Sequence, residues 1–478
     1  MPTGLYIDGA WIARERRLEV TDPSDGAVLT SVSDGGVDDA VAALDAAARA
    51  QAAWGRLNPR SRAELLRRAH ALMLERRDAF VDLMVLESGK PRAEAVGEFG
   101  LSAGFLLWAG EQVAHVHGAF GAGSSDGYRV VTTHQPVGPS LLITPWNFPL
   151  LMGARKMSAA LAAGCTVVVK SADLTPLTIA LLVATLADAG IPAGVVNLIH
   201  TSESPAVSAA LMTDRRLKKV SFTGSTRTGS VLLRQAADNI MSTSLELGGN
   251  GPFIVLDDAD VDHAVEQAIA CKFRNAGQAC VAANRIIVDA KVAEEFTRKF
   301  VAAAKELRVG NGFEDIEVGP IISRAQRDRA AGLVATALEE GATLLTGGHA
   351  IDGPGNFFEP TVLTHTDRAS RLAVEEIFAP IAVIYTAESI ADAIEFANDT
   401  DYGLAAYLFT KDLSRAVGIA ERLDSGMVGV NRGIMADPVA PFGGVKASGL
   451  GREGGDTGID EFLEQKYIAL TIDESELP

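Results

Sequence analysis

The sequence predicts an α/β protein with a doubly wound parallel sheet and a second α/β domain. From about residue 137 onward, short apolar runs alternate with Ala/Leu-rich segments of helical length. This alternation is typical of buried parallel strands joined by helices. The chain has 478 residues, too many for one simple core, so we expect two or three domains.

Two helical segments are expected before the sheet. Residues 36–53 are rich in alanine and carry acidic side chains early, as the N-terminus of a helix prefers. Residues 60–87 continue with apolar side chains at helical spacing. Gly89 and Pro91 flank Lys90 and predict a break at that point.

Two alternating series then follow. The first contains expected strands at 137–144, 166–170, 195–199 and 219–222 and a helix at 177–189. The second contains strands at 253–256 and 285–288 and helices at 260–274, 291–307 and 324–340. Segments 128–136 and 460–472 have strand character outside both series, and the Gly-rich segment 443–458 is expected to be a loop.

Composition excludes several classes of protein. The chain has 43 Lys and Arg against 61 Asp and Glu, a net charge of −18, so no nucleic-acid or anionic-membrane partner is expected. No run of eighteen apolar residues suggests a membrane span, and the first residues lack an apolar signal core. Three cysteines without a CxxC pair argue against a disulfide framework or a metal site. We therefore expect a cytoplasmic protein.

Two segments carry candidate catalytic residues. In NAGQAC, Cys280 lies among small residues that let a substrate approach a nucleophilic thiolate. In ELGGN, Glu246 leads into a double-glycine turn and can act as a general base where an apolar site raises its pKa. The structural alternatives are a buried small side chain for Cys280 and a surface carboxylate for Glu246.

Two loops suggest binding functions. In TPWNFPL, Asn147 offers an amide that can donate to an oxyanion, while Trp146 and Phe148 can wall a pocket. The alternative is a structural turn with buried aromatic residues. In FTGSTRTG, a Gly/Ser loop before a helical run can bind phosphate, although it is neither a GxGxxG fingerprint nor a P-loop.

In this order, these segments closely resemble the aldehyde dehydrogenase superfamily over roughly residues 5–470; the matching segments are TPWNFPL, VVVKSAD, FTGSTRTG, ELGGN, FRNAGQAC, EEIFAP and PFGGVKASGLGREGG. The resemblance implies that Cys280 attacks an aldehyde and that Asn147 and the cysteine N–H hold the oxyanion. It implies that Glu246 activates water to hydrolyse the resulting thioester. Glu453, in GREGG, matches a second carboxylate implicated in proton movement.

The resemblance also implies NAD or NADP as cofactor. The matching residues are Thr144, Trp146, Lys170, Asp173, Gly224, Ser225, Leu247, Glu376 and Phe378. Asp173 follows Lys170 by three residues, and a carboxylate there favours the ribose hydroxyls of NAD over the 2′-phosphate of NADP. An aspartate is shorter than the usual glutamate, which leaves NADP open. Ala379 stands where glycine is usual.

Within the superfamily, the chain most resembles the succinate-semialdehyde dehydrogenase group. Arg155 and Arg274 match two arginines that bind the substrate carboxylate there, a geometry that suits a guanidinium. Their structural alternatives are a helix-surface charge and an ion pair with a nearby acid. Ala436 replaces a serine that helps hold the carboxylate, which leaves an aromatic or medium-chain aldehyde as an alternative. Ala282 replaces a second cysteine.

Two rival functions remain at this stage. An acylating dehydrogenase would release the thioester to coenzyme A or phosphate, but it needs no water-activating base such as Glu246. A non-catalytic binding protein would be expected to lack some of the four residues Cys280, Glu246, Asn147 and Lys170, and all are present.

The resemblance finally implies an architecture and an assembly. We expect an NAD(P)-binding domain at 1–120 and 140–246 and a catalytic domain at 247–440. Residues 121–139 and 441–478 should form an oligomerisation arm and a C-terminal segment of a homodimer or homotetramer.

Overall fold

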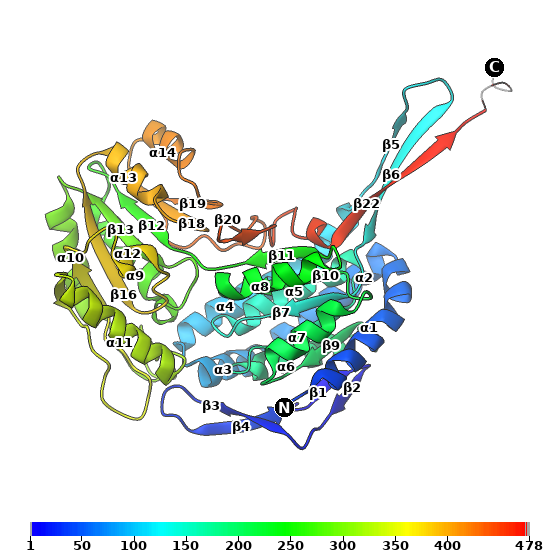
Figure 1. Ribbon diagram of the computed structural model, residues 1–478, viewed down its shortest axis with the longest axis horizontal. Coiled ribbons are helices and arrows are strands. Elements are labelled where there is room, and N and C mark those ends of the chain that lie inside the picture. Colours follow the sequence, from blue (N-terminus) through cyan, green and yellow to red (C-terminus); the bar gives the residue numbers. More distant parts are fainter. Residues whose placement is uncertain (1, 474, 476–478) are drawn as a thin grey trace.

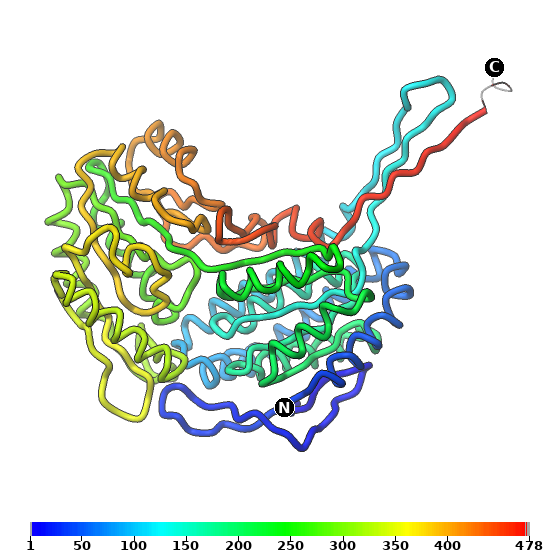
Figure 2. Tube along the Cα trace, in the orientation of Figure 1, coloured from blue at the N-terminus to red at the C-terminus, as the bar shows by residue number. Residues whose placement is uncertain are grey.

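The computed structural model describes residues 2–473 and 475 and contains two large sheets and a projecting arm (Figure 1). The α/β fold predicted from the alternation is confirmed. Figure 2 shows that the chain completes the first sheet almost entirely before it enters the second.

The first sheet has the strand order β2-β1-β9-β8-β7-β10-β11-β21. Its strands are β1 (Leu5–Ile7), β2 (Ala10–Ile12), β7 (Ser140–Ile143), β8 (Val167–Lys170), β9 (Val196–Ile199), β10 (Lys219–Thr223), β11 (Ser242–Glu246) and β21 (Gly449–Leu450). The strands from β9 to β11 are parallel, and antiparallel strands close both edges. The prediction of a parallel sheet therefore holds for its centre.

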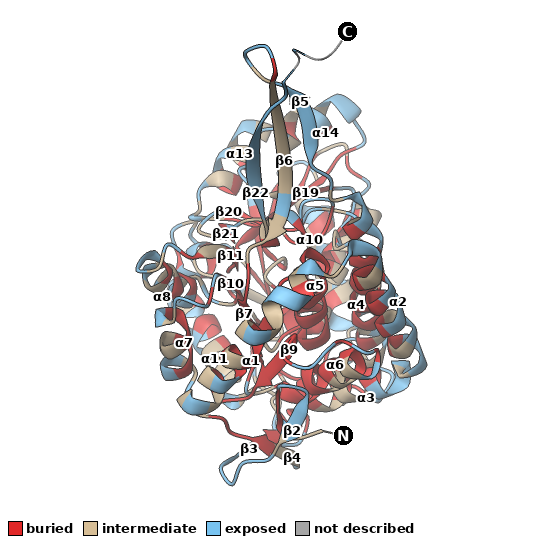
Figure 3. Cartoon of the chain, turned by 90° about the vertical axis from the view of Figure 1, so that its right-hand side faces the viewer, coloured by how far each residue is buried: buried red, intermediate tan, exposed pale blue. Residues whose placement is uncertain are grey.

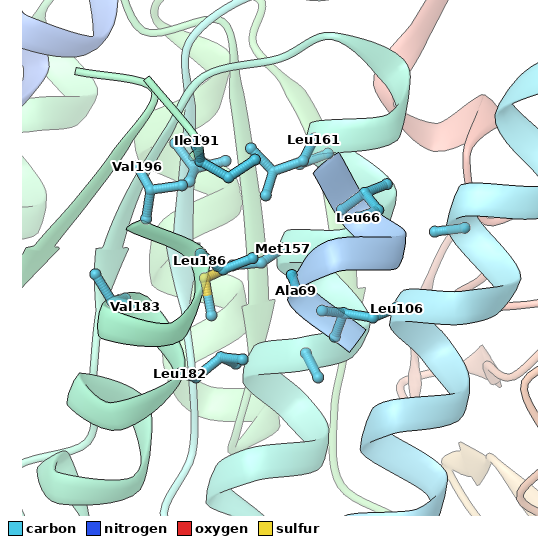
Figure 4. Packing of buried hydrophobic residues seen from close by; sticks show 14 of the residues in the cluster. Leu66, Ala69, Leu106, Met157, Leu161, Leu182, Val183, Leu186, Ile191 and Val196 are labelled. Carbon is cyan, nitrogen blue, oxygen red and sulfur yellow. The ribbon is translucent and has the colours of Figure 1, made fainter. Parts of the chain in front are cut away.

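Helices cover both faces of this sheet. They are α1 (Val37–Arg56), α2 (Pro59–Glu75), α3 (Arg77–Ser88), α4 (Arg92–Gln112), α5 (Pro149–Ala163), α6 (Pro176–Asp188), α7 (Ser204–Thr213) and α8 (Thr226–Ala237). In β8, Val167 and Val169 pack with α2 to α6, whereas Val168 packs with α1, α7 and α8. This alternation explains why the strand is apolar at every position. Figure 4 shows Leu66, Met157 and Leu182 meeting in the first of these cores.

The second sheet has the order β14-β15-β16-β13-β12-β18-β19. Its strands are β12 (Gly251–Val255), β13 (Ala283–Asp289), β14 (Thr343–Thr346), β15 (Thr361–Thr364), β16 (Ile381–Ala387), β18 (Ala405–Phe409) and β19 (Met427–Val430). The helices α9 (Val261–Phe273) and α10 (Ala293–Lys305) pack on one face. The other face packs against α11 (Arg324–Glu339), α12 (Arg371–Val374), α13 (Ile390–Asn398) and α14 (Leu413–Ala420).

A three-stranded arm projects from the first sheet (Figure 1). It consists of β5 (Ala119–Ala122), β6 (Tyr128–Pro136) and β22 (Leu463–Thr471). Figure 3 shows that the arm is far more exposed than the sheets. Two further pairs are β3 (Arg17–Thr21) with β4 (Val28–Ser33) and β17 (Tyr402–Gly403) with β20 (Val445–Lys446).

Several sequence expectations need correction. The helical stretch at 60–87 is two helices separated at Arg76, whose backbone (φ −98°, ψ 12°) leaves the helical region. The loop at 443–458 contains the short strands β20 and β21. Strand β11 and the N-terminal strands were not expected. Among the described residues, no helix is long and apolar enough to cross a membrane.

The order of strands marks where a ligand can bind. Strands β8 and β9 lie on one side of β7, and β10 and β11 lie on the other. In such a sheet, ligands bind beyond the carboxyl ends of the strands where the winding reverses. The loops at these ends begin at Thr144 after β7, Gly224 after β10 and Leu247 after β11.

Candidate active site

A cavity of about 340 Å³ lies at this edge of the sheet. It gathers many of the residues singled out from the sequence: Trp146, Asn147, Gly224, Ser225, Leu247, Cys280, Glu376 and Phe378. These residues come from loops of both sheets, so the cavity lies where the two sheets meet. Thr144, Lys170, Asp173, Glu246, Arg155 and Arg274 are not part of its lining.

A strained turn delivers Cys280 to the cavity. The short 3₁₀ segment Arg274–Gly277 contains Asn275 (φ 53°) and Ala276 (φ 54°) in the left-handed region. Gly277 has φ 71°, and a Cβ there would lie 2.1 Å from the Ala379 carbonyl oxygen. Only a glycine therefore fits, and non-glycine residues held at positive φ are typical of functional sites.

The environment of Cys280 keeps its thiol protonated. Burial raises the pKa of Cys280 to about 12, the carboxylates of Glu376 and Glu246 add to the effect, and Arg155 opposes it. A thiolate is the reactive form. The chain alone therefore holds the nucleophile in its unreactive state at neutral pH.

The Asn147 amide lies beside the segment that carries the nucleophile. The side chain is buried, and its Nδ2 donates to the carbonyl oxygen of Gln278 at 3.0 Å. Gln278 is two residues before Cys280. An amide nitrogen has two hydrogens, so one remains for an oxygen bound between Asn147 and Cys280.

Glu246 is buried at the end of β11, and its Oε2 has no hydrogen-bond partner. Burial raises the pKa of Glu246 well above its ordinary value, and Glu453 raises it further. The surface alternative considered from the sequence is therefore wrong. A buried carboxylate with a raised pKa and a free oxygen is suited to accept a proton from water.

Glu453 faces two cations on α5. Lys156 Nζ lies 2.5 Å from Glu453 Oε1, and Arg155 Nη1 lies 3.5 Å from Oε2. Burial raises the pKa of Glu453, but Lys156 and Arg155 outweigh it and hold the pKa below its ordinary value. The pKa values of the two neighbouring carboxyl groups are thus shifted in opposite directions, and Glu453 ionises at lower pH than Glu246.

Glu376 and Phe378 form another part of the cavity wall. Glu376 Oε1 accepts a hydrogen bond from the Gly249 N–H at 3.0 Å, and burial raises the pKa of Glu376 to about 7. Phe378 meets Trp146 edge to face, with 5.5 Å between ring centroids. Sequence analysis missed Arg329, which also lines the cavity.

Arg329 fixes the backbone of this wall. Its guanidinium donates to the carbonyl oxygens of Ile377 at 2.7 Å and Glu376 at 2.8 Å. No local motif marks Arg329, because it sits on α11 and is linked to these residues only by the fold.

The Gly/Ser loop at Gly224 and Ser225, predicted to bind phosphate, lies at the start of α8. Ser225 caps this helix by accepting a hydrogen bond from the Thr228 N–H at 3.3 Å. The hydroxyl of Thr223, which also lines the cavity, is buried without a partner. A helix N-terminus beside an unpaired hydroxyl fits a pyrophosphate, and the Glu376 carboxylate fits ribose hydroxyls. The cavity therefore suits a nicotinamide dinucleotide.

Lys170 and its neighbours lie at the edge of this region. Lys170 is buried, its Nζ donates to the Ser171 carbonyl oxygen at 3.1 Å, and burial lowers its pKa against the opposing charge of Asp173. Asp173 is exposed. The Thr144 N–H donates to the Lys170 carbonyl oxygen at 3.1 Å, and the Thr144 hydroxyl is buried without a partner.

A second, small cavity contains Arg274. Its lining also includes Val281, Tyr407, Ala436 and Phe442. Val281 follows Cys280 directly, so this cavity lies near the nucleophile. Arg274 packs over the Phe148 ring at 5.3 Å.

Arg155 lies behind the wall of this cavity. It is buried between the rings of Phe105, at 4.9 Å, and Phe442, at 4.2 Å. It does not line either cavity, and it pairs with Glu453. The helix-surface alternative for Arg155 is therefore wrong, while its contact with substrate stays a prediction.

Comparison with known proteins identifies the class of enzyme. Residues 11–468 match the aldehyde dehydrogenase family. A succinate-semialdehyde dehydrogenase from Paenarthrobacter nicotinovorans is 49% identical over 93% of this chain and 99% of its own length. The succinate-semialdehyde dehydrogenase [NADP(+)] of Escherichia coli (strain K12) is 44% identical over 98% of this chain and 97% of its own length.

A solved structure also matches the fold of this chain. The crystal structure of an NADP-dependent enzyme from E. coli superposes with a TM-score of 0.97 at 44% identity and covers 98% of each chain. The chain belongs to the aldehyde dehydrogenase family. It is an oxidoreductase that acts on aldehydes with NAD or NADP.

Proposed function

We propose that the protein oxidises an aldehyde with a terminal carboxylate, such as succinate semialdehyde, to the corresponding dicarboxylate. The observation that carries this proposal is the cationic Arg274 in a small cavity next to the nucleophile segment. A guanidinium there can pair with the far carboxylate while the aldehyde lies at Cys280. The names of the relatives, succinate-semialdehyde dehydrogenases, support the same substrate class.

The first chemical step is the attack of Cys280 on the aldehyde. The thiol passes its proton to a water molecule, and a carbon–sulfur bond forms as the carbonyl oxygen becomes an oxyanion. Asn147 Nδ2 and the Cys280 N–H are placed to donate to that oxyanion, which lowers the barrier because charge develops there.

The second step is the hydrolysis of the thioester. NAD or NADP, when bound, supplies the hydride acceptor that converts the cysteine adduct to a thioester. Glu246 then takes a proton from water, whose oxygen attacks the thioester carbon. The carbon–sulfur bond breaks, the sulfur takes the proton back from Glu246, and the acid and the Cys280 thiol are released. The charged Glu453 and Lys156 set the electrostatic environment of this base.

Two alternatives remain as outcomes of the test. The missing hydroxyl at Ala436 favours an aromatic or medium-chain aldehyde. An acylating dehydrogenase would not need the buried, unpaired Glu246.

The cofactor preference and the assembly are also part of the proposal. The exposed carboxylate of Asp173 supports NAD over NADP, although the E. coli relative is named for NADP. The apolar surface of the arm supports a homodimer or homotetramer. The two sheets support the division into a cofactor domain at 1–120 and 140–246 and a catalytic domain at 247–440. Three free cysteines support a reducing, cytoplasmic location.

The test is a comparison of kcat/KM for succinate semialdehyde, butanal and benzaldehyde, each with NAD and NADP. The proposal predicts a strong preference for succinate semialdehyde, and no NAD(P)H formation in Cys280→Ser. Equal or better turnover of the uncharged aldehydes would overturn the substrate class, and a preference for benzaldehyde would favour the aromatic alternative. Dependence on added coenzyme A would indicate the acylating reaction.

A further inference from the structure

A buried lysine lies behind the loop that carries Asn147. Lys90 follows Gly89, the left-handed C-cap of α3 (φ 73°), and precedes Pro91 at the start of α4. The side chain is fully enclosed, and it does not line either cavity of the active site. Because burying a charge costs several kcal/mol unless it is paired, the partners of Lys90 need an explanation.

The ammonium group of Lys90 has one charged and one backbone partner. Its Nζ lies 2.5 Å from Glu98 Oε2 and donates to the carbonyl oxygen of Asn147 at 2.8 Å. It also lies 4.4 Å from the centre of the Phe148 ring. The lysine thus holds the peptide group that immediately follows the Asn147 side chain.

Glu98 holds the other end of the same segment. Its Oε1 accepts hydrogen bonds from the N–H groups of Leu150, at 3.0 Å, and Leu151, at 3.1 Å. These groups belong to the first turn of α5 and would otherwise lack partners. Lys90 and Glu98 together therefore fix the loop from Asn147 into α5.

Glu94, one helical turn before Glu98 on α4, holds the nucleophile turn. Its Oε2 accepts a hydrogen bond from the Asn275 N–H at 2.8 Å. Asn275 has a positive φ, and its Nδ2 donates to the carbonyl oxygens of Asn147 at 2.9 Å and Gln278 at 3.2 Å. The two loops that carry Asn147 and Cys280 thus meet on one helix.

We propose that Lys90, Glu94 and Glu98 form a positioning frame, which sets the Asn147 amide relative to Cys280. The frame acts through the Asn147 peptide and the Asn275 turn, not on substrate directly. An amide stabilises a transition state most when it already points at the developing charge before the reaction begins. The buried ion pair, with its hydrogen bonds to the loop and to the first turn of α5, supplies a rigid support for it. This proposal rests on the cysteine chemistry of the proposed function, but not on a particular aldehyde.

The test is a double-mutant cycle with Lys90→Met and Asn147→Ala. The readout is the single-turnover rate of NAD(P)H formation, measured with the best aldehyde substrate. We expect Lys90→Met to slow this step about a hundredfold, as a misplacement of about 1 Å can. In the Asn147→Ala background, the same substitution should slow it less than about threefold, because the amide it positions is absent.

Lys219→Met is the matched control. Lys219 is also fully buried, and its Nζ donates to Ser244 Oγ at 2.5 Å. Unlike Lys90, it makes no hydrogen bond to the Asn147 loop or to the turn before Cys280. If removing a buried lysine only destabilises the protein, the single-turnover rate should fall by the same factor in the wild type and in Asn147→Ala. This should hold for Lys219→Met as well as for Lys90→Met. The positioning frame would be overturned if Lys90→Met slowed the single-turnover rate by the same factor in the wild type and in Asn147→Ala. It would also be overturned if Lys90→Met slowed the rate in neither.

Amide hydrogen exchange of the cofactor-free protein gives a readout that needs no turnover. Lys90→Met and Glu94→Met each remove a hydrogen-bond partner of these loops, and should speed exchange in segments 147–151 and 275–280. Lys219→Met should not. Unchanged exchange in both segments would contradict the proposal. Should Lys90→Met fold poorly, the exchange measured in Glu94→Met decides the outcome. A wild-type protein without any NAD(P)H formation would instead contradict the proposed function.

Discussion

At the scale of single residues, the cavity without cofactor disfavours the thiolate of Cys280. Burial and two carboxylates raise the pKa of this thiol to about 12. The rate of its alkylation by iodoacetamide should therefore rise about tenfold per pH unit from pH 7 to 10, without a plateau. Peptide mass spectrometry, with Cys280→Ser as control, measures this rate. A plateau between pH 8 and 9 would contradict the electrostatic account.

The pair of Glu246 and Glu453 gives a prediction with a defined sign. Burial and the charge of Glu453 raise the pKa of Glu246, so the basic form appears at higher pH than for an ordinary glutamate. Glu453→Gln removes a negative charge and leaves Lys156 unpaired, and both changes lower the pKa of Glu246. The acidic limb of the kcat–pH profile should shift to lower pH. A shift to higher pH would show that Glu246 is not the base.

The sequence motifs predicted which residues are candidates for the site, but they did not predict which side chains surround those residues. Cys280 and Asn147, singled out from the chemistry of their segments, line one cavity together with Glu376, which only the family resemblance implied. The partners of Arg155 could not be predicted, because Glu453 lies 298 residues away in sequence. For Lys90 the sequence predicted only a position in a helix break between Gly89 and Pro91. Its contacts with Glu98 and Asn147 could not be predicted, because they form only in the folded chain.

At the scale of elements, the turn before Cys280 depends on glycine. Gly277→Ala would place a methyl group against the Ala379 carbonyl and require an alanine at φ 71°. We expect a loss of at least about 1 kcal/mol of unfolding free energy, together with a fall in kcat, measured by denaturant titration and steady-state kinetics. Gly332→Ala on α11 is the control, since no atom lies within 4 Å of its added Cβ. It should be neutral or stabilising.

Periodicity predicted the elements with long apolar signals. Strands β8 and β9 and helix α1 fall within a few residues of their expected bounds. Strand β11 begins Ser-Thr-Ser, so no apolar run marked it, and β1 and β2 have three residues each. The helix break at Arg76 contains neither glycine nor proline. Such boundaries depend on tertiary packing more than on local signals.

At the scale of the whole molecule, the arm exposes apolar side chains on an unpaired edge. Tyr467 is 55% exposed, Ile468 39% and Leu470 40%, and β22 is an edge strand. Exposed apolar edges are usually covered by another chain. Ile468→Lys with Leu470→Lys should therefore shift the protein to monomers in native mass spectrometry. Leu74→Lys on α2, at an equally exposed leucine, should not change the assembly. A monomeric wild type would contradict this role of the arm.

Arg274 should decide whether the protein prefers an aldehyde with a terminal carboxylate. The measurement is the ratio of kcat/KM for succinate semialdehyde to that for butanal, in the wild type and in Arg274→Ala. Loss of a hydrogen-bonded charge pair should lower this ratio roughly tenfold to a hundredfold. Arg329→Ala, in the cofactor cavity, should weaken NAD(P) binding but leave the ratio unchanged. A ratio that Arg274→Ala leaves intact would show that this arginine does not recognise a substrate carboxylate.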